Sequence, residues 1–332
     1  MYLCINENKY AIPFLKTRCF FVKKKVFIDG SAGTTGLDIF RRISGREDIE
    51  LITLPEEKRK DTQARREALN SADIAFLCLP DAAAIESASL VENENTVLLD
   101  TSTAHRTNDA WAYGFPELSA AAKQKIETSK RIAVPGCHAS GFIALVYPLI
   151  ECGALEKDAK LTCFSITGYS GGGKKMIGAY EEEGRDELLS APRQYALSQK
   201  HKHLPEMQKI TGLENAPVFC PIVSDFYSGM EVTVPLFASE LAEGFGIEEI
   251  KKIYAEKYTG PVVSFAQGAD EEGFLSAGKR SGTDTMEISV HGNEERILLT
   301  ARYDNLGKGA CGAAIECLNL VLGADMTEGM NV

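Results

Sequence analysis

The chain has 332 residues, of which 44% are hydrophobic, and 36 Lys+Arg against 47 Asp+Glu give a formal net charge of −11. This length suggests two domains, each large enough to bury its own core. Nucleic-acid binding needs a clustered basic face, and this chain has no Lys/Arg block beyond Lys23–Lys25. No apolar run approaches the roughly 18 residues of a membrane-spanning helix. We therefore expect neither a nucleic-acid nor a membrane partner.

Nine cysteines are scattered along the chain with no CxxC pair and no histidine at zinc-finger spacing. This pattern is typical of free thiols in a reducing compartment, so we expect a cytoplasmic protein without a metal site. Residues 1–24 lack the apolar stretch and cleavage site of a secretory signal and form an N-terminal extension. An organelle-targeting segment stays an alternative for them.

From residue 25 the pattern is strand, glycine-rich turn and helix: KVFID, GSAGTTG and LDIFRRISG. Further buried strands are predicted at 50–54, 73–80, 95–102 and 132–135, with helical stretches between them. Near-continuous apolar strands that alternate with helices are typical of a parallel sheet. The fold class is therefore α/β, with a Rossmann-type, doubly wound nucleotide-binding domain.

The turn after the first strand predicts binding of a dinucleotide. Its glycines allow a tight turn, close approach of a pyrophosphate and exposure of the first helical N–H groups. A purely structural turn is the alternative, because the spacing GxxGxxG departs from the common GxGxxG. The expected cofactor-binding residues of this turn are Gly30, Ala32, Gly33, Thr34, Thr35 and Gly36.

The end of the second strand indicates which dinucleotide is bound. An acidic residue there selects the ribose 2′-OH of NAD, whereas the 2′-phosphate of NADP needs cations. Here the strand is followed by Lys58, Arg59 and Lys60, which favours NADP. A solvated charged loop is the alternative, since Glu56 and Glu57 intervene.

The segment VPGCHASG, residues 134–141, contains the candidate nucleophile. Pro135 and Gly136 break a strand, and Cys137 stands where the next helix begins. The positive end of a helix lowers a thiol pKa and favours a nucleophilic thiolate. A core cysteine is the alternative, although core cysteines such as Cys78 sit within apolar runs.

The candidate general base lies in QKHKHLPEM. Pro205 fits the first position of a short helix running toward Gly212, so His203 lies just ahead of a helix N-terminus. A neutral imidazole is favoured there, as a general base requires. His201 stays an alternative, whereas the ring of His138 can point away from its neighbour Cys137.

Taken together, these motifs make the chain resemble a known family, the N-acetyl-γ-glutamyl-phosphate reductases in their shorter variant. The wider group includes aspartate-semialdehyde and glyceraldehyde-3-phosphate dehydrogenases, and the extension 1–24 has no counterpart in the family pattern. The match is colinear from about Lys25 to the C-terminus and rests on the glycine turn, DTSTAHR (100–106), VPGCHASG (134–141), GYSGGGKK (168–175), KHKHLPE (200–206) and DNLGKGACGAAIECLN (304–319).

The resemblance implies NADPH-dependent reduction of N-acetyl-γ-glutamyl phosphate to the 5-semialdehyde, through a thioacyl intermediate on Cys137, in arginine biosynthesis. Asn305 would contact the nicotinamide carboxamide, and a helix cap is its alternative role. Ser102 and Gly171 are further cofactor contacts, and residues 168–173 are expected to form a flexible loop near the nicotinamide or the substrate. Arg106, Ser140 and Lys174 are candidate substrate contacts, and Arg106 is alternatively a buried structural arginine paired with an aspartate.

The residues near the C-terminus suggest how the chain divides into domains. Small residues after Lys308 permit close helix packing, so residues 25–137 plus 306–332 form the NADP-binding domain. Residues 138–305 form an α+β catalytic domain with a largely antiparallel sheet and an interface for a homodimer or homotetramer. A reductase of aspartyl or aminoadipyl phosphate is the second possibility, and a non-catalytic NADP sensor is the third. The presence of both Cys137 and His203 disfavours the sensor.

Overall fold

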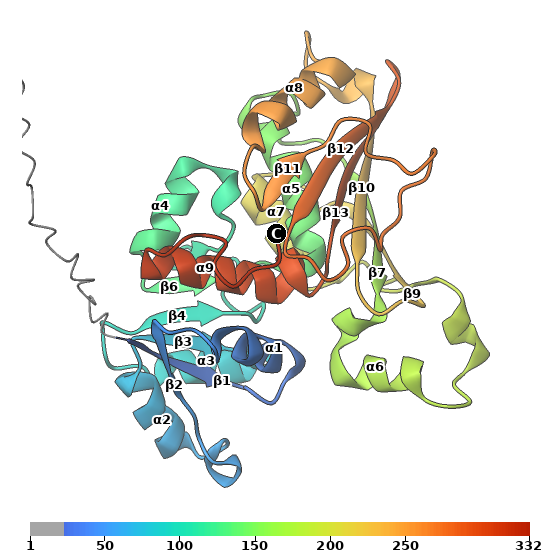
Figure 1. Cartoon of the computed structure of the whole chain (residues 1–332). Helices are drawn as coiled ribbons and strands as arrows, with labels where there is room; N and C mark the ends of the chain where they lie inside the picture. Colours follow the sequence, from blue (N-terminus) through green and yellow to red (C-terminus); the bar gives the residue numbers. More distant parts are fainter. Residues whose placement is uncertain (1–22) are drawn as a thin grey trace, which may run out of the picture.

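The computed structural model describes residues 23–332, which form two β-sheets with helices packed on them (Figure 1). The predicted extension 1–24 falls almost entirely outside these described residues. Strand β1 begins at Lys24, one residue before the predicted start of the nucleotide-binding domain. None of the helices in this part of the chain has the length and apolar character needed to cross a membrane.

The first sheet is parallel throughout, in the order β2-β1-β3-β4-β6-β5. The five predicted buried runs are confirmed as strands, and all except β1 are shorter than predicted, while β5 was not predicted. The run 73–80, for example, stops being strand at Leu77, because Pro80 caps the following helix. The strands are β1 Lys24–Asp29, β2 Ile49–Ile52, β3 Ile74–Leu77, β4 Val97–Asp100, β5 Ala112–Tyr113 and β6 Arg131–Ala133.

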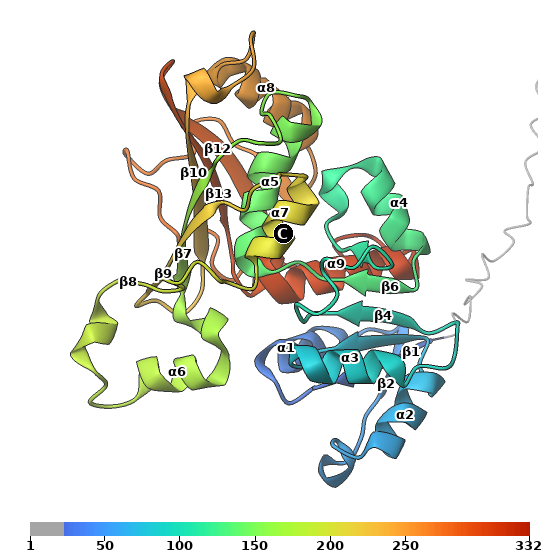
Figure 2. The same cartoon turned by 180° about the vertical axis from the view of Figure 1, so that it is seen from behind.

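Helices cover both faces of this sheet, as a doubly wound fold requires (Figures 1 and 2). Val26 and Ile28 pack in one core with Ile39 of α1 and Leu318 of α9, whereas the intervening Phe27 packs on the other face. Helix α9 thus packs against the parallel sheet although it comes last in the chain. One face carries α1 Thr34–Ile43, α4 Ala120–Thr128 and α9 Gly312–Leu322, and the other carries α2 Thr62–Ser71 and α3 Asp81–Ser89.

The second sheet is mixed, in the order β11-β12-β13-β10-β7-β9-β8. Only the pairs β7/β9 and β11/β12 are parallel, which confirms a largely antiparallel arrangement. The strands are β7 Thr162–Gly168, β8 Arg193–Gln194, β9 Val218–Ser224, β10 Met230–Phe237, β11 Val263–Phe265, β12 Met286–Gly292 and β13 Arg296–Tyr303.

Three helices pack on one face of this sheet, namely α5 Cys137–Glu151, α7 Leu204–Thr211 and α8 Ile247–Lys257 (Figure 1). The opposite face exposes large apolar side chains at Phe164, Val218, Phe237 and Leu298, with exposed fractions of 44, 56, 59 and 41%. The short helical turns are η1 Glu56–Lys58, η2 Pro116–Leu118, η3 Tyr169–Gly172, η4 Glu187–Ser190, η5 Ala238–Glu240 and the π-helical η6 Gly307–Cys311.

The segment GYSGGGKK is not a loop, contrary to the prediction. Tyr169–Gly172 forms the turn η3, and Gly173 begins helix α6, which runs to Glu181. Tyr180 of α6 is buried and its ring stacks on Tyr169 with centroids 4.6 Å apart. This aromatic contact gives the glycine-rich segment a fixed place on the edge of the second sheet.

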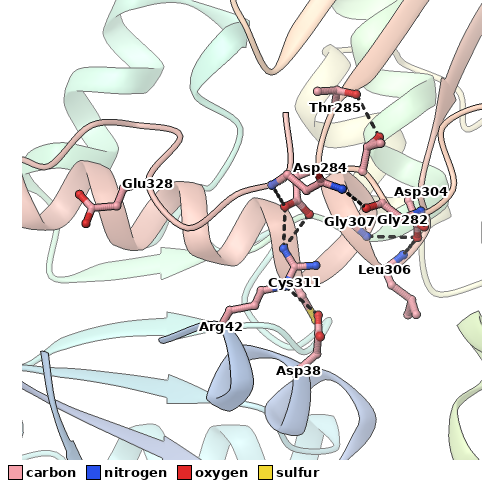
Figure 3. A network of polar contacts seen from close by, with 12 residues as sticks. Asp38, Arg42, Gly282, Asp284, Thr285, Asp304, Leu306, Gly307, Cys311 and Glu328 are labelled. Carbon is pink, nitrogen blue, oxygen red and sulfur yellow. Dashed lines mark hydrogen bonds and ion pairs between the residues drawn. The ribbon is translucent and has the colours of Figure 1, made fainter. Parts of the chain in front are cut away.

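A network of polar contacts joins the two sheets' layers (Figure 3). Nη1 of Arg42, on α1, donates to both carboxylate oxygens of Asp284 at 2.7 Å. Asp284 in turn pairs with the backbone of Asn331 near the C-terminus, in both directions at 2.8 Å. Nearby, the carboxylate of Asp304 accepts the backbone N–H groups of Gly282 and Leu306. These bonds hold the nucleotide-binding layer against the loop that precedes β12.

Candidate active site

Cys137 is the first residue of helix α5, as predicted, and Gly136 is the N-cap. The chain reaches it from β6 through Val134 and Pro135, so the sulfur lies at the carboxyl edge of the parallel sheet, where ligands of open α/β sheets bind. The half-buried side chain of Cys137 lines a cavity of about 290 Å³. This cavity is also lined by residues of the second sheet and of the segment 201–203 that leads into α7, so it lies between the two layers.

The sequence predicted a lowered pKa for the thiol of Cys137, but in the structure this pKa is raised. Burial raises its pKa, and the charge of Arg106, the backbone N–H of His138 and the charge of Lys202 oppose this effect without cancelling it. Desolvation of a thiolate therefore outweighs the helix end in this site. The resting thiol keeps its proton, and a base has to remove it.

His203 lies where the sequence predicts, as the N-cap of α7, with Pro205 in the first turn and Gly212 closing the helix. Its side chain is buried, and burial lowers the pKa well below the usual histidine value, with further lowering by Arg106 and neighbouring groups. The ring is therefore neutral. Its Nδ1 atom is buried without a hydrogen-bond partner among the described residues. A neutral imidazole with an unused ring nitrogen suits a general base.

The other two histidines of the cavity are neutral and already bonded. His138 lines the cavity instead of pointing away, with Nδ1 2.6 Å from Ser165 Oγ and Nε2 2.6 Å from Tyr195 OH. Burial lowers the pKa of His138 to about 3 and that of His201 to about 4. Nδ1 of His201 accepts the backbone N–H of His203 at 3.2 Å. Both rings therefore support the site, and His203 remains the better candidate for the base.

Glu206 is a site residue that the sequence reasoning missed. Its buried carboxylate accepts the backbone N–H of Gly136 at 2.8 Å and the hydroxyl of Tyr113 at 2.8 Å through Oε1. Through Oε2 it accepts Nη1 of Arg106 at 3.1 Å. The available signal was an acidic residue in the first turn of a helix, three positions after His203, within KHKHLPE. Glu206 thus fixes the turn that presents Cys137.

Arg106 has the structural role that the sequence left as its alternative, with a glutamate as the partner. Nε donates to the carbonyl of Val134 at 2.9 Å and Nη2 donates to the carbonyl of Thr101 at 2.9 Å. The buried ion pair with Glu206 completes this set. Arg106 still borders the cavity, but its charge is compensated there.

The glycine turn after β1 has the geometry of a nucleotide-binding turn. Gly30 has φ +92°, and a Cβ there would overlap the carbonyl oxygen of Cys78. A Cβ on Gly36 would overlap the carbonyl oxygen of Gly30, and Gly33 is the N-cap of α1. The helix N-terminus that follows is the kind of end that binds phosphate groups.

A second cavity of about 640 Å³ extends from this turn over the ends of β1 and β2. It is lined by Gly30 and Ala32 of the turn and by the cations Arg59 and Lys60, while Thr34 and Thr35 line the cavity of Cys137. The two cavities therefore lie on either side of one glycine turn. Together the two cavities suit a dinucleotide, and Arg59 and Lys60 of the larger cavity suit a 2′-phosphate on its ribose.

Asn305 and Gly171 also line the cavity of Cys137. The Asn305 side chain accepts the N–H of Gly229 and donates to Ser170 Oγ, both at 2.9 Å. It does not cap the following helical turn, because the neighbouring Asp304 accepts the N–H groups at its start. Asn305 thus ties two loops together at the cavity wall.

Six predicted contacts line neither of these two cavities, and two of them, Gly33 and Gly36, belong to the glycine turn itself. The hydroxyl of Ser102 donates to Asp100 at 2.8 Å, and that of Ser140 donates to the carbonyl of Gly136 at 3.1 Å. Lys58 is exposed on η1, next to the cations that line the larger cavity. Lys174 lines a separate cavity of about 430 Å³ between α1 and α6. The two hydroxyls are therefore used in hydrogen bonds within the protein, and the two lysines lie outside both cavities.

Two family models match the chain, both from semialdehyde dehydrogenases. The NAD binding domain matches residues 25–126, and the dimerisation domain matches residues 137–305. Among solved structures, aspartate semialdehyde dehydrogenase II from Vibrio cholerae shares the fold, with a TM-score of 0.71 and 17% identity over 91% of this chain and 99% of that one.

Curated relatives are much more similar in sequence. The N-acetyl-γ-glutamyl-phosphate reductase of Sinorhizobium medicae is 43% identical over 310 residues, which cover 91% of this chain and all of the relative. The reductase of the same name from Chelativorans sp. is 45% identical over 306 residues, which cover 90% and 98%. The chain therefore belongs to the N-acetyl-γ-glutamyl-phosphate reductase family of the semialdehyde dehydrogenases.

Proposed function

We propose that this chain reduces N-acetyl-γ-glutamyl phosphate to N-acetylglutamate 5-semialdehyde with NADPH and releases phosphate, as a step of arginine biosynthesis. The observation that carries the proposal is the convergence of Cys137, the neutral His203 and the nucleotide-turn residues Thr34 and Thr35 on one cavity. The relatives named for this reaction, at 43 and 45% identity, support the substrate.

The residues support a covalent route. As the sulfur of Cys137 bonds to the acyl carbon, the thiol proton passes to His203. The carbon–oxygen bond to the phosphate then breaks, phosphate leaves with the bonding electrons, and a thioester on Cys137 remains. When bound, NADPH supplies a hydride to the thioester carbon. His203 returns the proton to the departing sulfur when the semialdehyde is released.

Backbone groups at the start of α5 stabilise the oxygen anion that forms at the acyl carbon. Helix N-termini have N–H groups without helical acceptors, and Gly136 as the N-cap offers no side chain in competition. Preorganised donors of this kind typically contribute about 2.7–4 kcal/mol each. The bond from Gly136 to Glu206 keeps this turn in place.

The cofactor is held by the turn 30–36, with Arg59 and Lys60 near the 2′-phosphate. Asn305 and Gly171 contribute to the nicotinamide end. The proposed division of the chain is residues 25–137 plus 306–332 for cofactor binding and residues 138–305 for catalysis. The packing of α9 on the parallel sheet supports the discontinuous first domain.

We also propose a homodimer or homotetramer, formed through the uncovered face of the second sheet. Phe164, Val218, Phe237 and Leu298 expose apolar surface there, and the matching family model is a dimerisation domain. The free thiols among residues 23–332 suit the cytoplasm as the working compartment. Light scattering that shows a monomer at micromolar concentration would contradict the oligomer.

The decisive experiment runs the reaction in reverse, since the acyl phosphate is labile. NADP reduction by N-acetylglutamate semialdehyde is measured with and without phosphate, for the wild type and for Cys137→Ser. Activity that requires phosphate and disappears in the variant is expected. Activity that survives the substitution would exclude the covalent route, and wild-type protein inactive with this substrate would exclude the proposed function.

A further inference from the structure

Two cationic side chains, Arg106 and Lys202, line the cavity around Cys137 in the described part of the chain. The substrate of the proposed function has an acyl phosphate and a carboxylate, so both its ends are anionic. The position of each cation relative to Cys137, and the partners that each already has, therefore determine which substrate group it can bind.

Arg106 is compensated before any substrate binds. Its guanidinium forms a buried ion pair with Glu206 and donates to the carbonyls of Thr101 and Val134. Glu206 opposes this charge only in part, since Arg106 lowers the pKa of Cys137 more than Glu206 raises it. However, Nε, Nη1 and Nη2 of the guanidinium each already donate a hydrogen bond within the protein. The guanidinium N–H groups that remain can donate hydrogen bonds, but the pair as a whole is neutral.

Lys202 has no such partner. Its side chain is exposed, and no carboxylate of residues 23–332 lies within ion-pair distance of its ammonium group. Asp81 is near enough to have its pKa affected by Lys202, but both Asp81 oxygens already accept hydrogen bonds from Thr103. The ammonium group is therefore free to bind a ligand anion.

The charge of Lys202 also reaches the reacting groups. It lowers the pKa of Cys137 against the raising effect of burial, and it contributes to the low pKa of His203. Lys202 lies between His201 and His203 in sequence, on the segment that presents the proposed base. Its place relative to the sulfur is therefore tied to the geometry of the catalytic pair.

We propose that Lys202 binds the phosphate group of the acyl phosphate, and inorganic phosphate in the reverse reaction. This inference rests on the proposed function. In the acyl phosphate the phosphorus is two bonds from the carbon that Cys137 attacks, whereas the α-carboxylate is several bonds farther along the chain. A free cation on the cavity that Cys137 lines can therefore reach the phosphate of a substrate whose acyl carbon lies at the sulfur. The same charge stabilises the phosphate as it leaves.

The test is a comparison of Michaelis constants in the reverse reaction for the wild type, Lys202→Met and Lys202→Arg. Lys200→Met is the matched control, because Lys200 is exposed, two residues away and outside the cavity lining. A hydrogen bond between charged groups corresponds to roughly a tenfold to hundredfold change in binding. We expect that rise in the KM for phosphate in Lys202→Met, recovery within a few-fold in Lys202→Arg, and no change in Lys200→Met.

The other two substrates distinguish the alternatives. The KM values for NADP and for the semialdehyde are expected to stay within a few-fold of the wild type. An unchanged KM for phosphate would overturn the inference. A rise confined to the KM for the semialdehyde would assign Lys202 to the carboxylate, and a rise confined to NADP would assign it to the cofactor, and both results would also overturn it.

A second measurement separates this inference from the proposed function. Inorganic phosphate is added while Cys137 is alkylated by iodoacetamide, and the modified peptide is quantified by mass spectrometry. Phosphate is expected to change the alkylation rate in the wild type and in Lys202→Arg, but not in Lys202→Met. Equal phosphate effects in all three proteins would overturn the inference, even if the proposed substrate were wrong.

Discussion

Glu206 accepts the backbone N–H of Gly136 at 2.8 Å, so a carboxylate on α7 holds the turn from which Cys137 projects. The same carboxylate pairs with Arg106 and accepts the hydroxyl of Tyr113. His203, the proposed base, is the N-cap of the same helix. One short helix therefore positions both the base and the backbone next to the nucleophile.

The first prediction concerns Glu206→Gln. The substitution removes the charge that compensates buried Arg106, and breaking a buried pair by removing one partner typically costs about 3–5 kcal/mol. We expect a loss of this order in the free energy of unfolding, measured by urea denaturation, together with a fall in kcat. The control is Glu214→Gln, because Glu214 is exposed and lies three residues after the end of α7. This variant is expected to change neither the free energy of unfolding nor kcat. Wild-type kcat in Glu206→Gln would contradict the positioning role.

The second prediction concerns Gly136→Ala. A Cβ at this position would overlap Nη1 of Arg106 and would lie 2.6 Å from Nε2 of His203. We expect the turn to shift and kcat to fall by at least about a hundredfold, since small misplacements of reacting groups have effects of that size. The control is Gly178→Ala, inside α6, where a Cβ meets nothing and helix stability rises. A Gly136→Ala enzyme with normal kcat would show that this close approach is unimportant.

The third prediction concerns the pH dependence of Cys137. Burial raises the pKa of its thiol, so the thiolate fraction near neutral pH is smaller than in a free cysteine, whose pKa is about 8.5. The iodoacetamide alkylation rate of the free enzyme is therefore expected to rise with pH toward a midpoint above that value. The same peptide in the urea-unfolded chain should show the ordinary midpoint. A folded-state midpoint below the unfolded one would reverse the sign and favour a preformed thiolate.

The fourth prediction separates two neighbouring cations. Arg59 lines the large cavity near the ends of β1 and β2, whereas Lys58 does not. We expect Arg59→Gln to lower kcat/KM for NADPH by roughly tenfold to a hundredfold and to change kcat/KM for NADH little, because NADH has no 2′-phosphate. Lys58→Gln should resemble the wild type with both cofactors. A larger loss of kcat/KM for NADPH in Lys58→Gln than in Arg59→Gln would show that the 2′-phosphate does not bind at Arg59.

The fifth prediction concerns the ion pair between the two layers. Asp284 is almost fully buried and binds Arg42 through both oxygens, so Asp284→Asn leaves the partly buried guanidinium with only the more exposed Asp38 as a charge partner (Figure 3). We expect the free energy of unfolding to fall by about 3 kcal/mol in urea denaturation. In the control, Glu248→Gln breaks the exposed pair with Lys251 and should cost less than about 1 kcal/mol. Equal small losses in both variants would show that the Asp284 pair does not contribute to stability.

The order of strands and helices in the first sheet could be predicted from the sequence, because each of these elements depends on a local pattern of apolar and turn-forming residues. The continuous apolar run in KVFID predicted a strand buried on both faces, and Val26 and Ile28 indeed face one core while Phe27 faces the other. The start of α5 at Cys137 followed from Pro135 and Gly136, which end the preceding strand for steric reasons. The places of Cys137, His203 and the glycine turn were predictable because helix ends and tight turns have residue signatures.

Contacts between distant segments could not be read in this way. The sequence does not show that Glu206 contacts Gly136, 70 positions away, and Arg106, 100 positions away. Only the packing of α7 against the turn brings these residues together. The sequence analysis named Lys174 and not Lys202 as a candidate substrate contact, whereas the fold places Lys202 and not Lys174 on the cavity that Cys137 lines. The pKa of Cys137 also depends on the surrounding layers, since burial is a property of the whole fold. Local residue chemistry thus determined which groups can react, and tertiary packing decided their neighbours, their charge states and their access to the substrate.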